Sequence, residues 1–128
     1  MQYLLDTHVL LWLTTDSPSL SPAARRIILS SASELYLSKV SIWEIAIKSS
    51  LRKLDLGMGM REFMQTHVLP NRIVIMDLKI DHIYAVEKLE FLHRDPFDRL
   101  LVAQSLMEKM PIVTNDAHIA RYPVKTVY

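Results

Sequence analysis

The sequence has no cysteine and only two glycines among its 128 residues, and both scarcities exclude classes of function. Without cysteine, the chain has no disulfides, zinc thiolate sites, iron–sulfur clusters or cysteine nucleophiles. Gly57 and Gly59 match neither the glycine-rich fingerprint of dinucleotide-binding proteins nor a phosphate-binding P-loop. A His-Glu-x-x-His zinc motif is also missing. The chemistry must therefore come from other residue types.

Long apolar runs and an excess of one charge are also missing. Fifteen basic residues against fourteen acidic ones give a formal net charge of +1, so contacts with nucleic acid phosphates would have to be local. The longest apolar run, residues 9–13, is far too short to span a bilayer. The N-terminus has no basic segment or cleavage site of a signal peptide. We expect a cytoplasmic protein that does not enter a membrane.

The chain contains no internal repeat, low-complexity tract or flexible linker, so we expect residues 1–128 to form one domain. Residue patterns predict alternating elements, with strands over 3–5, 34–38, 72–76, 112–114 and 124–127 and helices over 7–15, 22–31, 41–51, 58–68, 81–89, 96–109 and 117–120. Parallel strands need helical crossovers, and this alternation supplies them. The predicted fold is α/β, a three-layer α/β/α sandwich with a mostly parallel central sheet.

Four acidic residues fall where such a fold places its ligands, just outside the carboxyl ends of the strands. Asp6 ends the first predicted strand, and Asp116 follows the strand at 112–114. Glu44 and Asp98 lie in the first turns of the helices at 41–51 and 96–109. Taken singly, each acid also fits a purely structural role, because Asp and Glu cap helix N-termini. Ser41 and Glu44, for example, have the spacing of a capping box.

Taken together, the four acids predict a metal site. Glu44 lies in an apolar stretch, where a buried carboxylate is costly unless it meets a cation or hydrogen-bond donors. Carboxylates that converge at one sheet edge also raise one another's pKa, and a divalent cation relieves this repulsion. Oxygen-only ligands favour Mg²⁺ or Mn²⁺ over Zn²⁺. Metal-assisted phosphoester hydrolysis is the chemistry of such a cluster, and it needs no protein nucleophile.

Several stretches of the chain resemble PIN-domain ribonucleases, and more narrowly the toxin subunits of VapBC-type toxin–antitoxin pairs. They are Leu-Leu-Asp-Thr-His-Val-Leu-Leu-Trp (4–12), Ser-Ile-Trp-Glu-Ile-Ala-Ile-Lys (41–48), His-Arg-Asp-Pro-Phe-Asp-Arg-Leu-Leu-Val-Ala-Gln (93–104) and Thr-Asn-Asp (114–116). The resemblance implies that the chain is a single PIN-like nuclease domain. It also implies that Mg²⁺ or Mn²⁺ binds to the catalytic acids, which are Asp6, Glu44, Asp98 and Asp116. It further implies cleavage of RNA, a homodimer, and neutralisation by a small VapB-type antitoxin whose tail lies over the site.

Other polar residues near the acids have two interpretations each. Asp95 precedes Pro96 and fits an N-cap first and an auxiliary site residue second. Basic residues after Glu44 either contact substrate phosphates or form a solvated helix face; these are Lys48, Arg52 and Lys53. Arg99 either contacts phosphate or the antitoxin's acidic groups, or pairs with a neighbouring carboxylate. The side chains of Thr7, Thr114 and Asn115 either hold metal-bound water or bond locally to the backbone.

We predict no catalytic or metal-binding role for the tryptophan, histidine and methionine side chains. Trp12 and Trp43 occupy apolar helical positions, which favours core packing. The histidines share no metal-ligand spacing, and we assign a metal to none of them; they are His8, His67, His82, His93 and His118. The methionines Met58, Met60 and Met64 are candidates for an adaptable apolar surface that binds a partner.

Two other function classes are compatible with such a sheet. One is a catalytically silent PIN-like module that binds RNA or protein without a metal. The other is a phosphate-transfer protein, but a dehalogenase-like phosphatase needs Asp-x-Asp after the first strand, where this chain has His8. A receiver domain needs paired acids there and a phosphoacceptor, for which Asp77 is the one candidate. The sequence does not encode which RNA would be cut, or whether one or two metals bind.

Overall fold

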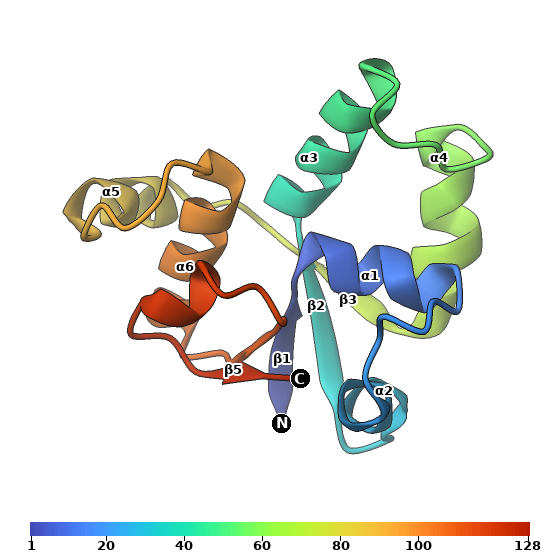
Figure 1. Cartoon of the computed structure of the whole chain (residues 1–128), viewed down its shortest axis with the longest axis horizontal. Helices are drawn as coiled ribbons and strands as arrows, with labels where there is room; N and C mark the ends of the chain where they lie inside the picture. Colours follow the sequence, from blue (N-terminus) through green and yellow to red (C-terminus); the bar gives the residue numbers. More distant parts are fainter.

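The computed structural model describes residues 1–128 and contains one five-stranded sheet with helices around it (Figure 1). The strands are β1 (Gln2–Leu5), β2 (Glu34–Ser38), β3 (Ile73–Met76), β4 (Ile112–Val113) and β5 (Thr126–Val127). Their spatial order is β3-β2-β1-β4-β5, and every neighbouring pair is parallel. The predicted α/β fold is confirmed, and the sheet is parallel throughout.

The helices fall close to their predicted positions. They are α1 (Thr7–Thr14), α2 (Pro22–Leu29), α3 (Lys39–Ser50), α4 (Met60–Phe63), α5 (Ile80–Lys88) and α6 (Pro96–Glu108). A π-helical turn η1 (Met64–Val68) and a 3-10 turn η2 (Leu69–Asn71) extend α4, and a 3-10 turn η3 (Ile119–Arg121) replaces the short helix predicted over 117–120. None of these helices is long and apolar enough to cross a membrane.

Side-chain caps and left-handed residues fix the ends of these elements. Ser21 accepts a hydrogen bond from the N–H of Ala24 and begins α2, with Pro22 at its first position. Ser38, and not Ser41, caps α3 by accepting a hydrogen bond from Val40 N at 3.0 Å, so this helix starts two residues earlier than predicted. Strand β3 begins at Ile73, one residue late, because Arg72 adopts a left-handed conformation with φ 58°.

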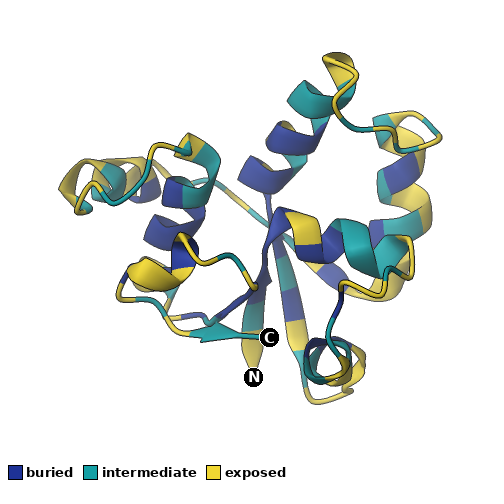
Figure 2. Ribbon diagram, viewed as in Figure 1, coloured by how far each residue is buried: buried dark blue, intermediate teal, exposed yellow.

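The sheet is buried on both faces, which gives the three layers. Successive residues of β1 point to opposite sides: Leu5 belongs to a core cluster with α1 and α2, and Leu4 belongs to a second cluster with Leu101 and Val102 of α6. Figure 2 shows the buried residues along the central strands and on the inner helix faces. A strand with both faces covered reads as a continuous apolar run, as residues 3–5 do.

Two predictions about apolar side chains need correction. Trp43 is not a core residue, because 57% of it is exposed on α3. Trp12 does pack against the core cluster on the α1 side of the sheet. The methionines at positions 58, 60 and 64 also pack against that cluster and are partly buried. They therefore contribute to the domain's own packing, which leaves only part of each side chain for a partner surface.

Candidate active site

The structure brings the four predicted acids to one end of the sheet. Asp6 directly follows β1, and Asp116 comes shortly after β4, the parallel neighbour of β1. Glu44 lies on α3, which follows β2, and Asp98 lies in the first turn of α6. Because parallel strands share their carboxyl-terminal edge, these elements deliver all four carboxylates to the same region. Their mutual charge repulsion is among the causes that raise the pKa of both Asp6 and Asp98.

Asp6 is buried, and it does not cap the helix that follows it. Its side chain makes no capping hydrogen bond to α1 and instead accepts one from Thr114 Oγ1 at 2.7 Å. Thr114 Oγ1 in turn accepts a hydrogen bond from Asp116 N at 3.0 Å, which links the two strand ends. Burial raises the pKa of Asp6, while the Thr114 hydrogen bond and His8 oppose this rise. Asp6 therefore does not have the structural role, side-chain capping of the following helix, that was its alternative interpretation.

Glu44 is a buried carboxylate with two partners. Thr7 Oγ1 donates to its Oε1 at 2.7 Å, and Lys48 Nζ donates to its Oε2 at 2.5 Å from one turn along α3. Ser41 lies within α3 and not at its start, and its Oγ is 2.9 Å from Thr7 Oγ1 of α1. The capping box considered for Ser41 and Glu44 therefore does not form. The residues that neutralise and orient Glu44 therefore come from α1 and from α3 itself.

Lys48 is a cation placed among the acids. Its burial disfavours the charged form, but the hydrogen bond and charge of Glu44, together with Asp95 and Asp98, raise its pKa. Arg52 does not share this position, because α3 ends at Ser50 and Arg52 adopts a left-handed conformation with φ 57°. Lys53 is exposed beyond the helix end but lines a pocket of about 240 Å³ together with Lys48, Thr7 and His8. The predicted solvated surface therefore fits Arg52 better than Lys53.

Asp98 carries the largest electrostatic perturbation at this end of the sheet. Its pKa is raised to about 7, chiefly by burial and further by repulsion from Asp95, Asp6, Asp116 and Glu44. Its Oδ2 atom lies 3.1 Å from His93 Nε2. The carboxylate is therefore surrounded by other acids and hydrogen-bonded to a histidine for which we predicted no role.

Asp95 and Asp116 both have a structural task. Asp95 Oδ1 accepts hydrogen bonds from Phe97 N at 2.9 Å and Asp98 N at 3.0 Å, which confirms the predicted N-cap of α6. Asp116 Oδ1 accepts a hydrogen bond from His118 N at 2.7 Å in the loop that leads into η3. Asp116 thus orders its loop and also contributes negative charge to the cluster.

The acidic side chains are of the right chemical type to bind a divalent cation, but they do not lie close together in this structure. No three Asp, Glu or His side chains lie near enough together to hold one ion as they stand. Glu44 is turned toward Lys48, and Asp98 is turned toward His93. Carboxylate oxygens are nevertheless the ligands that Mg²⁺ and Mn²⁺ prefer. The raised pKa values of Asp6 and Asp98 reflect burial and repulsion that a cation would relieve.

Arg99 does not have either of the roles predicted for it. The side chain is buried, and its guanidinium donates to Glu90 O at 3.1 Å, Val86 O at 3.3 Å and Tyr122 Oη at 3.0 Å. It also lies over the Phe91 ring, 4.8 Å from the centroid. Arg99 therefore ties the segment after α5 to α6 and contacts no carboxylate.

Some residues beside the acids were missed or misplaced by sequence reasoning. His93 contacts Asp98, and the available signal was its place in the same His-Arg-Asp-Pro-Phe-Asp-Arg segment. Trp43 packs edge-on against Phe97 with 5.2 Å between ring centroids. Since these aromatics directly precede Glu44 and Asp98 in the chain, their contact joins α3 to α6 next to the site. Asn115 is exposed.

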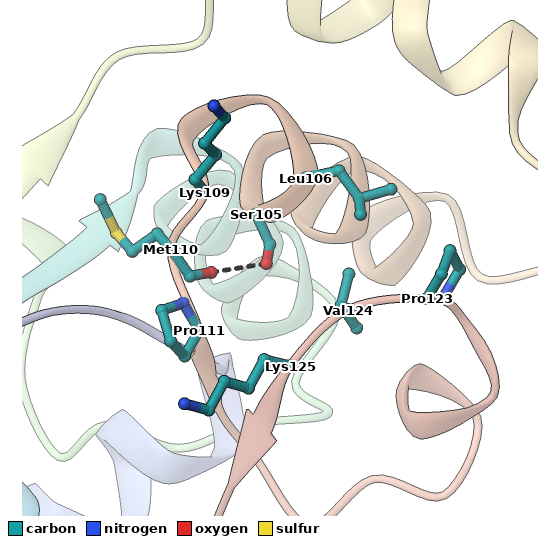
Figure 3. Close-up of a pocket in the computed structure, with 8 residues that line it drawn as sticks. All are labelled: Ser105, Leu106, Lys109, Met110, Pro111, Pro123, Val124 and Lys125. Carbon is teal, nitrogen blue, oxygen red and sulfur yellow. Dashed lines mark hydrogen bonds between the residues drawn. The ribbon is translucent and has the colours of Figure 1, made fainter.

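Two pockets lie outside the acid cluster. The pocket in Figure 3 has a volume of about 300 Å³ and is lined by segments that lead into β4 and β5, at the opposite end of the sheet from the acids. The hydrogen bond from Ser105 Oγ to Met110 O, 2.6 Å long, closes one side of it. A second pocket of about 420 Å³ lies beside α1, with an apolar wall that includes Leu11, Trp12 and Phe63. The second pocket comes near the site through His8, and a pocket of about 240 Å³ lined by Thr7, His8 and Lys48 lies directly beside Glu44.

Comparisons with known proteins agree with this arrangement. A model of the PIN domain family matches residues 3–125. The fold is similar to that of VapBC2 from Rickettsia felis bound to a promoter DNA fragment, with TM-score 0.75, 17% identity, and coverage of 99% of this chain and 98% of that one. DNA-bound VapBC from Salmonella typhimurium gives TM-score 0.72 and 15% identity, with 99% and 97% covered.

FitAcB from Neisseria gonorrhoeae gives TM-score 0.64 and 18% identity, with 98% of this chain and 96% of that one covered. A comparison with curated proteins yields no match. At these identities the solved structures establish similarity of fold, whereas the family model spans nearly all of the sequence. With its parallel sheet and its four acids at one sheet edge, the chain belongs to the PIN domain family.

Proposed function

We propose that the protein is a divalent-metal-dependent endoribonuclease that acts as the toxin of a type II toxin–antitoxin pair. The observation that carries the proposal is the convergence of four carboxylates at the carboxyl end of β1 and β4, with the pKa of Asp98 raised to about 7 by burial and by its acidic neighbours. Membership of the PIN domain family supports a nuclease. Such a cluster is costly for the fold and is retained where it binds a cation.

Asp6, Glu44, Asp98 and Asp116 would hold Mg²⁺ or Mn²⁺. When bound, the cation would activate a water molecule and stabilise the charge that develops on the phosphate during hydrolysis. The chain's own residues orient the ligands: Thr114 fixes Asp6 and Thr7 fixes Glu44 through hydrogen bonds of 2.7 Å each. These two threonines are therefore proposed as positioning residues.

Lys48 is proposed to serve the substrate. Its ammonium group pairs with Glu44, and 37% of its side chain remains exposed. Its exposed part is therefore available to contact a substrate phosphate beside the acids. Such a local contact is what RNA binding requires in a chain whose net charge is only +1.

The proposed partners follow from the surfaces near the site and from the structural neighbours. The similar structures are VapBC and FitAcB assemblies, which supports a VapB-type antitoxin for this chain. The apolar pocket beside His8 and Trp12 offers such a partner a surface next to Asp6. On α5, Ile80, Ile83 and Tyr84 are exposed on one helix face, which supports a homodimer. A cytoplasmic location fits the whole proposal.

Cleavage of mixed cellular RNA tests the function directly. The RNA is incubated with the purified parent protein in the presence of Mn²⁺ or of EDTA. Parallel reactions with Mn²⁺ use Asp98→Asn and the control Asp81→Asn, which removes an exposed acid on α5. We expect discrete fragments from the parent and the control, and none with EDTA or Asp98→Asn. A folded parent, free of antitoxin, that neither cuts RNA nor binds Mn²⁺ would favour the catalytically silent module instead.

A further inference from the structure

A chain of hydrogen bonds leads from a buried arginine to one of the four acids. Arg99 Nη1 lies 3.0 Å from Tyr122 Oη, Tyr122 Oη lies 2.8 Å from His93 Nδ1, and His93 Nε2 lies 3.1 Å from Asp98 Oδ2. The chain joins Asp98 and Arg99 of α6 to His93 in the loop before this helix and to Tyr122, the residue after η3. The turn η3 packs beside α6 (Figure 1). Its members are distant in sequence, as His93 and Tyr122 are separated by 29 positions.

Arg99 sets the direction of every bond in this chain. A guanidinium group has only N–H donors, so Arg99 donates to Tyr122 Oη. The phenolic proton of Tyr122 then needs an acceptor, and His93 Nδ1 is the one within reach. A neutral imidazole that accepts at Nδ1 carries its proton on Nε2. His93 Nε2–H therefore donates to Asp98 Oδ2.

The opposite neutral tautomer of His93 fits the structure poorly. Its proton on Nδ1 would point at Tyr122 Oη, which also accepts from Arg99. The Tyr122 proton would then have no acceptor, although this side chain is only 3% exposed. An unsatisfied buried hydroxyl is costly. The plane of the His93 ring is also fixed, since His118 stacks on it at 5.3 Å with an angle of 3° between the rings.

We propose that His93 is a positioning residue, held by Arg99 and Tyr122 in the Nε2–H tautomer so that it presents a hydrogen-bond donor to Asp98. The inference rests on the proposed function, in which Asp98 is a metal ligand. Hydrogen bonds to ligating carboxylates fix their orientation, and loss of such an outer partner lowers metal affinity about 10- to 100-fold. The arrangement explains why His93, Asp98 and Arg99 occur in one short segment: the arginine orients the histidine, and the histidine orients the acid.

Nitrogen NMR of the histidine side chains tests the direction of the chain without any metal or substrate. Spectra of the metal-free parent at alkaline pH, where imidazole is neutral, should show the Nε2–H tautomer for His93. In Tyr122→Phe, the Nδ1 resonance of His93 should shift toward that of a nitrogen with no hydrogen bond. An Nδ1–H tautomer in the parent would overturn the inference, whatever the protein does to RNA.

Calorimetric titration with Mn²⁺ tests the consequence for Asp98. His93→Phe keeps a flat ring beside His118 and removes the donor, and we expect its Mn²⁺ affinity to fall about 10- to 100-fold. His93→Gln places an amide N–H near the position of Nε2 and should restore most of that loss. His67→Gln, in η1, serves as the matched control with the parent's affinity.

The outcomes separate the two proposals. Equal Mn²⁺ affinity in the parent and in His93→Phe, with both proteins folded by circular dichroism, would overturn the positioning role of His93. A parent that shows the Nε2–H tautomer but binds no Mn²⁺ would instead overturn the proposed metal-dependent function. Recovery in His93→Gln supports the positioning role, because a merely space-filling role would be better served by phenylalanine.

Discussion

Thr114 donates a 2.7 Å hydrogen bond to Asp6 across 108 positions of sequence. The bond joins the residue that follows β1 to the residue that follows β4, and both are buried. Thr114 Oγ1 also accepts from the backbone N–H of Asp116. One hydroxyl group therefore sets the spacing between two of the four acids, which makes Thr114 the most direct structural test of how the site is assembled.

Thr114→Val removes this hydroxyl and nearly preserves the volume of the side chain. Asp6 then loses its donor while it stays buried, and we expect the free energy of unfolding to fall by roughly 1–3 kcal/mol. The measurement is urea denaturation at neutral pH. Thr114→Ser, which retains the hydroxyl, should lose much less. Equal losses in both variants would show that packing of the methyl group, and not the hydrogen bond, matters at this position.

Asp98 makes the metal-free protein less stable as the pH rises. Its pKa is about 7 in the folded state against an ordinary value of 3.8, so the folded state holds a proton that the unfolded chain releases. The stability associated with this group is fully present below about pH 4 and is lost as the pH rises to about 7 and above. A carboxylate whose pKa is lowered in the folded state shows the reverse, because its stabilising effect is lost as the pH falls.

Asp98→Asn should remove this pH-dependent loss. In EDTA, we expect the variant to be more stable than the parent at about pH 8 by on the order of 2 kcal/mol, a value reduced to allow for solvent screening of a partly exposed group. The difference should shrink toward zero near pH 4. Denaturation curves at several pH values measure it. A difference that does not depend on pH would contradict a raised pKa for Asp98.

The alternating pattern of the sequence was enough to predict the fold. Apolar runs such as residues 3–5, followed by helices with proline or serine at their starts, predict parallel strands with crossovers, and parallel sheets place their ligand sites at the carboxyl ends of the strands. This rule singled out Asp6 and Asp98 as candidate site residues, and the structure brings both to that end of the sheet. Asp95 was recognised as a cap because its type and its place before Pro96 define the role locally.

What the sequence did not reveal are pairings between distant segments. Ser38 and Ser41 are both suitable caps, and only the position of the strand end decides that Ser38 begins α3. The exposure of Trp43 depends on how α3 lies relative to α6. The bond between His93 and Tyr122 depends on where the loop before α6 meets η3. Local propensity carries no information on such contacts.

Lys48→Met is expected to separate metal binding from RNA cleavage. Loss of the ammonium group leaves Glu44 free to turn to a cation, so the Mn²⁺ affinity should rise several-fold. RNA cleavage should fall, because the phosphate loses its nearest cationic contact. Calorimetry and the rate of RNA cleavage measure the two effects. Lys88→Met, which removes an exposed cation on α5, is the matched control. A parallel fall in both quantities would contradict the competition between Lys48 and the metal.

Arg99→Met is expected to destabilise the fold far more than an equivalent change nearby. The guanidinium donates to the Glu90 and Val86 carbonyls and to Tyr122, and methionine can replace none of these hydrogen bonds. We expect a loss of roughly 1–3 kcal/mol in the free energy of unfolding, since the buried Tyr122 hydroxyl is left without its donor. Arg94→Met, in the same loop but exposed, should stay within about 0.5 kcal/mol of the parent.

Hydrogen exchange locates the effect of Arg99→Met. Because the side chain ties the segment after α5 to α6, amides in residues 89–95 should exchange faster in this variant, whereas those of β1 and β2 should follow only the loss of global stability. The Nε2–H tautomer of His93 should also be less well defined, since Tyr122 loses the donor that orients its proton. Unchanged exchange in this loop, with equal stability of both arginine variants, would mean that Arg99 neither holds the loop nor orients Tyr122.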